Sequence, residues 1–150
     1  MKIIDAIYSR MINEMAPVPP ETGGIIGGHG DIVEYVCFDT PNINGAAVNL
    51  PPCRYIPNVG LLNEQIEEWR IQGIDFYGVF HTHSHSMHEL SSGDKDYIMT
   101  IMKAMPEFVS ELYFPLVLPG ESMVSYIATR NDKGIFINGD TIERIEKKCE

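Results

Sequence analysis

Two histidines that share one face of a predicted strand are the strongest chemical feature of this sequence. His81 and His83 close residues 75–83, whose aromatic and β-branched side chains predict a β-strand. Residues two apart in a strand point to the same face, so both imidazoles aim at one point while Thr82 faces the other way. Zinc takes three or four N, O or S ligands. The pair therefore suggests a zinc site, although two histidines alone are equally compatible with a satisfied or exposed pair.

Asp94 is the candidate for a third ligand. It lies where the helical periodicity of residues 94–105 begins, and the short loop before it can bring this helix start beside the strand end. A carboxylate here also suits the positive end of the helix dipole. A purely structural interpretation competes with this one, because Ser91-Ser92-Gly93-Asp94 has the form of a capping box.

The elements that must position these side chains follow from apolar periodicity and from Pro, Gly and Asn signals. Helices are predicted at residues 3–15, 58–72, 94–105 and 141–148, the last capped by Asp140. Strands are predicted at residues 25–26 and 32–38, which form a hairpin within residues 22–38, and at residues 75–83, 112–118, 122–129 and 134–137, with a short edge strand at Tyr55-Ile56. Residues 41–52 are expected to form a loop, and 75–83 a central, covered strand. This order predicts a mixed α/β layered fold.

The length and charge of the chain limit its class. A chain of 150 residues without repeats or linkers is expected to form one domain, residues 1–150. The net charge of -10 argues against nucleic acid as a partner, because phosphate binding draws on clustered Lys and Arg. Such an excess is most simply a solvated acidic surface.

Neither a membrane segment nor a disulfide framework is evident in the sequence. Residues 1–16 are interrupted by Lys2, Asp5 and Arg10, unlike a signal peptide, and no later run is apolar enough to span a bilayer. Cys37, Cys53 and Cys149 are odd in number and form no C-x-x-C pair, which predicts reduced thiols. We therefore expect a cytoplasmic protein.

The combined pattern resembles a known family. The run His81-Thr82-His83, seven residues, Ser91, two residues and Asp94 is similar to the JAMM motif of JAB/MPN+ metallopeptidases. As in that motif, a glycine in the strand, Gly78, precedes it. The segment Glu21-Thr22-Gly23-Gly24-Ile25-Ile26-Gly27-Gly28 resembles the family's upstream glutamate at the start of a Gly-rich strand. The similarity in element order extends from the first helix to beyond Asp94.

This resemblance implies a fold and a set of roles. The fold would be the JAB/MPN, cytidine deaminase-like layered fold, with a mixed central sheet flanked by helices. His81, His83 and Asp94 would bind Zn²⁺, with an attacking water in the fourth position. Glu21 would be the general base, and Ser91 would donate a hydrogen bond to the oxyanion.

The role of Glu21 depends on this resemblance, and the loop after the strand departs from the family pattern. Spacing alone does not select Glu21 over Glu34 or Glu89, and Glu21 by itself would be an exposed turn residue. Family members often have proline after the second histidine and before the serine, where this chain has Ser84 and Leu90, so the loop path is less rigid.

The loop after the strand and the size of the chain also bear on function. His85 and His88 could bind a second metal or replace a ligand, or lie in a solvated loop. The large insertions of ubiquitin-clamping members are absent from the sequence, which is typical of a compact prokaryotic-type domain.

The expected function is that of a zinc metallopeptidase or isopeptidase. It would hydrolyse the bond after the C-terminal Gly of a ubiquitin-like or sulfur-carrier-like protein, whose tail would add to a sheet edge beside the hairpin and residues 41–52. One alternative is a metal-bearing module that binds such tails without cleavage. Another is a zinc hydrolase of small amides or nucleobases, against which the missing P-C-x-x-C ligand motif counts. The complete Glu, His, His, Ser and Asp set favours the enzyme.

Overall fold

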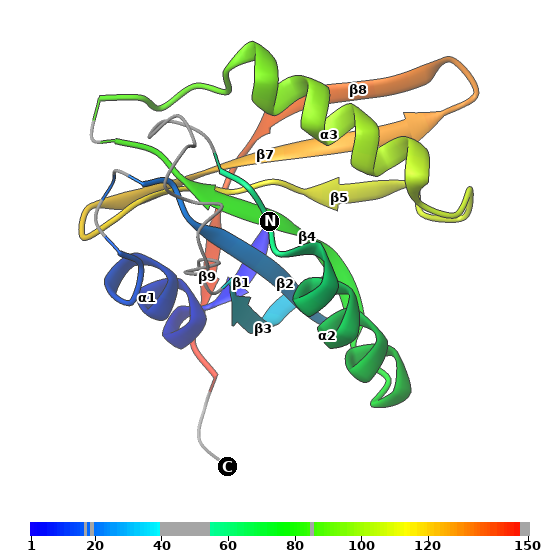
Figure 1. The fold of residues 1–150 in the computed structure, drawn as a ribbon. Coiled ribbons are helices and arrows are strands. Elements are labelled where there is room, and N and C mark those ends of the chain that lie inside the picture. Colours follow the sequence, from blue (N-terminus) through cyan, green and yellow to red (C-terminus); the bar gives the residue numbers. More distant parts are fainter. Residues whose placement is uncertain (17, 19, 40–54, 85, 148–150) are drawn as a thin grey trace.

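The fold is a mixed sheet with helices on both faces (Figure 1). The computed structural model describes residues 1–16, 18, 20–39, 55–84 and 86–147. In chain order the elements are β1 (Lys2–Ile4), α1 (Asp5–Asn13), β2 (Gly23–His29), β3 (Ile32–Phe38), α2 (Val59–Ile71), β4 (Asp75–Thr82), α3 (Ser92–Ala104), β5 (Glu111–Tyr113), β6 (Leu116–Leu118), β7 (Ser122–Asn131), β8 (Gly134–Asp140) and β9 (Glu143–Ile145). The strand order is β5-β7-β6-β4-β2-β3-β1-β9, and β8 pairs with β7. The predicted mixed α/β class is confirmed.

Strand β4 lies at the centre of the sheet, as its sequence predicts. It pairs antiparallel with β2 and parallel with β5 and β6. The register sets His81 opposite Gly23 on one side and Leu116 on the other. Hydrogen bonding on both edges fixes the strand end that carries the two histidines.

Neighbouring residues of the central strands pack into two separate hydrophobic cores, one on each face of the sheet. Ile25 and Val79 face the core that includes Trp69 of α2 and Met102 of α3. Ile26 and Phe80, one position further along each strand, face the core formed with α1. Since side chains alternate along a strand, His81 projects on the same face as Val79, toward α2 and α3.

Arg130 of β7 anchors the far end of α3. Its guanidinium donates to the carbonyls of Met102, Pro106 and Val109 at 2.7, 2.6 and 2.7 Å. These carbonyls lie in and just beyond the last turn, where a helix leaves acceptors without intrahelical partners. The helix that begins beside Asp94 is therefore held against the sheet at its other end.

Both ends of the chain differ from the predicted helices. Residues 2–4 form β1, so the first helix begins only at Asp5. The predicted final helix is wrong, because residues 143–145 form β9, which pairs parallel with β1. Asp140 does not cap a helix but ends β8, where it accepts a hydrogen bond from Ser125 Oγ. In both places pairing between distant strands overrides a weak local helical preference.

Several smaller predictions can also be compared with the structure. The hairpin of residues 22–38 and the helices at 58–72 and 94–105 are confirmed as β2–β3, α2 and α3. Tyr55-Ile56 is not a strand, and the predicted strand at 112–118 is divided into β5 and β6. The expected loop at 41–52, together with Cys53, His85 and Cys149, lies outside the described residues.

Two further sequence expectations concern thiols and membranes. Cys37 is a free, half-buried thiol, and burial raises its pKa. In the part of the chain that the structure describes, no helix combines the length and apolar composition needed to cross a membrane.

Gly78 is the backbone position on which the central pairing depends most. It has a φ of 153°, and a Cβ atom there would lie 1.7 Å from the carbonyl oxygen of Tyr113 on β5. We expect Gly78→Ala to lower the free energy of unfolding by about 3 kcal/mol or more, because it forces the β4 and β5 backbones apart. Urea denaturation measures this change.

Gly139→Ala on β8 is the matched control, since a Cβ there meets no atom within 4 Å. It should change the stability by less than about 1 kcal/mol. Equal effects of the two substitutions would contradict the close approach of β4 and β5.

Candidate metal centre

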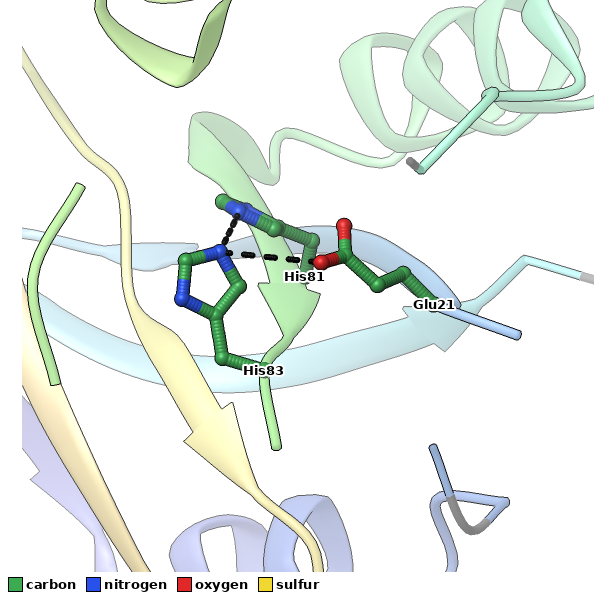
Figure 2. Close-up of side chains that lie close together, drawn as sticks. All are labelled: Glu21, His81 and His83. Atoms are coloured by element: carbon green, nitrogen blue, oxygen red, sulfur yellow. Dashed lines mark hydrogen bonds and ion pairs between the residues drawn. The ribbon is translucent and has the colours of Figure 1, made fainter. Parts of the chain in front are cut away.

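The imidazoles of His81 and His83 meet at the end of β4 (Figure 2). Their Nε2 atoms are 3.0 Å apart, and the ring planes cross at 74°. Both residues are nearly buried, with 7% and 2% of their surface exposed. As the alternation of the strand predicts, two nitrogen ligands converge on one point.

His83 is held in the orientation that a metal ligand needs. Its Nδ1 lies 3.0 Å from the main-chain carbonyl of Met87, and a carbonyl can only accept. The proton therefore resides on Nδ1 in the neutral ring, which leaves the Nε2 lone pair directed at the centre. The main chain is also fixed, because the His83 N–H donates to Val117 at 3.0 Å.

Asp94 completes a triangle with the two histidines from the first turn of α3. One carboxylate oxygen lies 3.1 Å from His81 Nε2, and the other lies 3.1 Å from His83 Nε2. These separations are close to the ~3.3 Å edge of a tetrahedron built with zinc bonds of ~2.0–2.1 Å. The donor set and spacing fit a zinc ion.

The capping-box interpretation of this segment is also realised. The Ser91 N–H donates to Asp94 Oδ2 at 2.8 Å, and the Asp94 N–H donates to Ser91 Oγ at 3.1 Å. The two interpretations are compatible, because an aspartate has two oxygens with several lone pairs. The cap orients the carboxylate, as a partner hydrogen bond does for many metal ligands.

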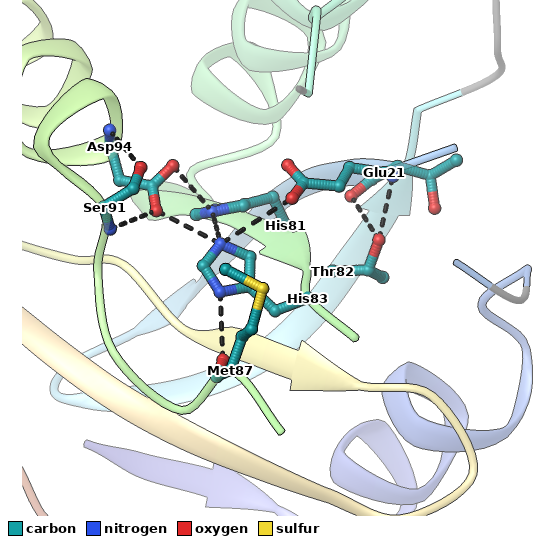
Figure 3. Close-up of polar contacts among 8 residues, drawn as sticks. Glu21, His81, Thr82, His83, Met87, Ser91 and Asp94 are labelled. Carbon is teal, nitrogen blue, oxygen red and sulfur yellow. Dashed lines mark hydrogen bonds and ion pairs between the residues drawn. The ribbon is translucent and has the colours of Figure 1, made fainter. Parts of the chain in front are cut away.

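Glu21 approaches the histidines from the side opposite Asp94 (Figure 3). Its Oε1 is 3.9 Å from His83 Nε2, and only 6% of the side chain is exposed. Ligand atoms of Glu21, His81 and His83 all lie within 4.8 Å of one another, so this cluster could itself hold a metal ion. Because Asp94 is closer to the histidines, its carboxylate is the better ligand by geometry, and Glu21 stands a short distance beyond.

The neighbouring threonines hold Glu21 in place. The Thr82 N–H donates to the Thr22 carbonyl at 2.8 Å, and the Thr22 N–H donates to Thr82 Oγ1 at 2.9 Å. Thr82 is fully buried and points away from the histidines, as the strand pattern predicts. These two hydrogen bonds tie Thr22, the residue after Glu21, to β4.

The pKa values of the acidic groups reflect their crowding. Burial works against the charged Asp94, but hydrogen bonds from His81 and His83 outweigh it and hold the Asp94 pKa far below its usual range. Burial raises the pKa of Glu21, and the charge of Asp94 adds to this rise against the influence of the histidines. Glu21 is thus the carboxyl more ready to carry a proton.

The pKa of His83 is raised as well. Burial opposes its charge, yet hydrogen bonds to Asp94 and Met87 and the charges of Asp94 and Glu21 outweigh that effect. Four electron-pair donors thus face one another across a space of a few ångströms. A cation relieves this repulsion, and in its absence a shared proton must do so.

A groove of about 830 Å³ gives access to this cluster. Glu21, His81 and Asp94 lie in its wall together with Ser91. The convergent side chains are therefore accessible from this groove.

Tyr55 is the residue near the centre that sequence reasoning missed. Its ring stacks on His81, with centroids 6.2 Å apart and planes within 9°, and it also lines the groove. Burial raises the pKa of its hydroxyl well above the usual value, and the bond to Asp39 adds to this. No local pattern in the sequence reports such a contact, because Tyr55 follows the long segment of residues 41–52. His88, the alternative ligand, is exposed.

Comparisons with known proteins give a fold but no sequence relative. No family model and no curated protein matches the chain. A JAB1/MPN domain protein from Archaeoglobus fulgidus matches in structure with a TM-score of 0.50 at 16% identity, covering 97% of this chain and 100% of that one. A protein from Desulfitobacterium hafniense matches with a TM-score of 0.62 at 17% identity, covering 98% and 94%. A protein from Salinibacter ruber matches with a TM-score of 0.56 at 17% identity, covering 100% and 95%.

These matches define the class of fold. The chain has the JAB/MPN fold over nearly its full described length, and the resemblance that the motif predicts is confirmed at that level. The fold and the buried histidine and carboxylate cluster are consistent with a metallohydrolase.

The geometry predicts how metal binding responds to substitution. The purified protein should contain about one zinc per chain, and His83→Ala and Asp94→Ala should each lose most of it, because two remaining ligands hold zinc poorly. Elemental analysis after gel filtration measures the content. Bound zinc should also be released as the pH falls, since both imidazoles must be deprotonated to bind.

Two variants separate ligand loss from other effects. His88→Ala removes an exposed histidine of the same loop and should keep the zinc. Ser91→Ala removes the helix cap but no ligand and should keep it as well. Full zinc retention in both His83→Ala and Asp94→Ala would refute the ligand assignment.

Proposed function

We propose that this protein is a zinc-dependent metallopeptidase or isopeptidase of the JAMM type. The observation that carries the proposal is the arrangement of Asp94 and Glu21 on opposite sides of one imidazole pair. His81, His83 and Asp94 would hold the metal, while Glu21 remains close enough to exchange a proton with a group bound there. A site built only for structural zinc has no use for this second carboxylate.

Each residue then has a chemical task. His81, His83 and Asp94 would hold a zinc ion, whose Lewis acidity would acidify a water and polarise the scissile carbonyl. Glu21 accepts the proton of the attacking water at its carboxylate and delivers it to the leaving amine.

Ser91 lines the groove on the side of Asp94, across the histidines from Glu21 (Figure 3). Its Oγ accepts the Asp94 N–H, so the hydroxyl proton remains available for a second partner. We propose that it donates to the carbonyl oxygen as negative charge develops there. The capping bond fixes the position of the donor before substrate arrives.

We propose that the substrate is the tail of a ubiquitin-like or sulfur-carrier-like protein, cut after its C-terminal Gly. Beside the metal centre, β2 is paired with both β3 and β4, so its edges are not available for an added strand. The tail would instead lie in the groove along Ser91 and Asp94. Residues without side chains would pass most easily between the groove walls, which favours Gly-Gly.

Two other functions fit parts of this arrangement. A metal-bearing module that binds such tails without cleaving them would use the same ligands but would not need Glu21. A zinc hydrolase of small amides or nucleobases would use both. The missing P-C-x-x-C ligand motif counts against the nucleobase hydrolase.

Glu21→Gln separates chemistry from metal binding. The variant should keep its zinc and fold, because the amide replaces a carboxylate that is not a ligand, yet lose roughly 10²–10⁴-fold in rate. Glu89→Gln, an exposed glutamate of the loop before α3, is the control and should cleave normally. A Glu21→Gln variant with the wild-type rate would remove Glu21 from the mechanism.

Substrate class can be tested with fusion proteins. Fusions whose tail ends in Gly-Gly before the cut should be cleaved, whereas the same fusions ending in Ala-Val or Leu-Leu should be resistant, because their side chains obstruct the groove. Mass spectrometry of the products locates the cut. Equal cleavage of all three would leave a peptidase without the ubiquitin-like preference, and no cleavage by zinc-loaded protein would favour the binding module.

A further inference from the structure

The ring of Tyr55 is built into the wall of the metal centre, and we propose that it is a positioning residue for His81 and Glu21. The inference rests on the proposed function, which gives those two residues their roles. It adds a pair, Asp39 and Tyr55, which the metal-site motif does not include. The pair connects the end of β3 to the start of α2.

Asp39 fixes the outer end of the Tyr55 side chain. The Tyr55 hydroxyl donates to Asp39 Oδ2 at 2.7 Å, and the N–H of Asn58, the N-cap of α2, donates to the same oxygen at 2.9 Å. Asp39 is itself held by its N–H, which donates to the Gly23 carbonyl of β2 at 2.7 Å. The carboxylate thus ties together β2, the ring and the helix start.

Gly23 leaves room for the Tyr55 ring to lie against β2. A Cβ atom at this position would lie 2.3 Å from the Phe80 carbonyl oxygen of β4 and 2.7 and 2.9 Å from two carbon atoms of the Tyr55 ring, closer than such atoms can approach. Glycine therefore allows both the close approach of β4 and the contact of the ring with β2 at the residue that pairs with His81. This observation is independent of the hydrogen bond to Asp39 and points to the same placement.

In this position Tyr55 lies beside His81 and Glu21, the two residues that it would position. Its ring lies parallel to the His81 imidazole, whereas His83 is oriented through its Nδ1 bond to Met87. Glu21 and Tyr55 also line the same groove, so the ring borders the space in which the Glu21 carboxylate lies. One residue thus supports a proposed metal ligand directly and lies beside the proposed general base.

The buried Asp39 carboxylate depends on the donors that surround it. Asp39 is only 8% exposed, and among the residues that the structure describes its Oδ1 has no hydrogen-bond partner. Burying a carboxylate with an unsatisfied oxygen costs free energy. A phenylalanine at position 55 would remove one of the two donors to Asp39 Oδ2, so the hydroxyl and its acceptor hold the ring in place as a pair.

Zinc affinity measured without substrate tests the inference. Tyr55→Leu removes the stacked ring, and we expect about a 10–100-fold loss of zinc affinity, the effect typical of a lost ligand-orienting contact. Tyr55→Phe and Asp39→Asn keep the ring but weaken its anchor, and each should cause a smaller loss. Competition with a chromophoric chelator gives the affinities. The visible spectrum of the Co²⁺ form should change in Tyr55→Leu, because the His81 ring loses its support.

Tyr113→Phe is the matched control, since it removes the hydroxyl of another half-buried tyrosine, which packs in the core on the α1 side of the sheet. Its zinc affinity and Co²⁺ spectrum should equal those of the wild type. Wild-type affinity and spectrum in Tyr55→Leu would overturn the inference, even if its thermal midpoint fell. Should Tyr55→Leu fail to fold, wild-type affinity in both Tyr55→Phe and Asp39→Asn would overturn it. A wild-type protein that binds zinc but cleaves no fusion would refute the proposed reaction and leave this test intact.

Discussion

The structure depends on holding two imidazole nitrogens and a carboxylate, all of them electron-pair donors, within a few ångströms of one another. Two imidazole nitrogens are 3.0 Å apart, and a carboxylate lies 3.1 Å from each. Without a shared proton or a metal these groups repel, so the surrounding fold must supply the energy that keeps them together. The burial of His81 and His83 adds to this cost. Such a cluster is difficult to explain as a device for stability.

The fold meets this demand with rigid supports on each side. Strand β4 is hydrogen-bonded on both edges at the residues before the cluster, and the Thr22 and Thr82 pair links the segment that carries Glu21 to it. Helix α3 is fixed at its start by the capping box and at its end by Arg130. Asp94 gains its place from a helix terminus and the histidines gain theirs from a strand, so the geometry does not rely on the loop between them. Sites supported by regular elements in this way hold their ligands with little freedom.

The parts of this arrangement that rest on local pattern could be predicted from the sequence, and those that rest on distant pairing could not. Strand alternation placed His81 and His83 on one face with Thr82 opposite, and the serine and aspartate spacing gave the cap of α3. The terminal segments were predicted as helices because their periodicity is locally helical, whereas β1 forms by pairing with β3 and β9, and β9 by pairing with β1. Tyr55 could not be found, because its role comes from contacts with Asp39, Gly23 and His81, which no sequence spacing connects. Glu21 was chosen through a resemblance, and its approach to the histidines is a property of the β2 and β4 register.

The central claim is that His81, His83 and Asp94 bind the metal while Glu21 stands outside its coordination sphere. The most direct test is a crystal structure of the zinc-loaded protein, with anomalous diffraction at the zinc edge to locate the ion. The account predicts one zinc bonded to both Nε2 atoms and to one Asp94 oxygen at ~2.0–2.2 Å, with Glu21 beyond bonding distance. Zinc bonded to Glu21 with Asp94 turned away, or zinc located elsewhere in the protein, would contradict it.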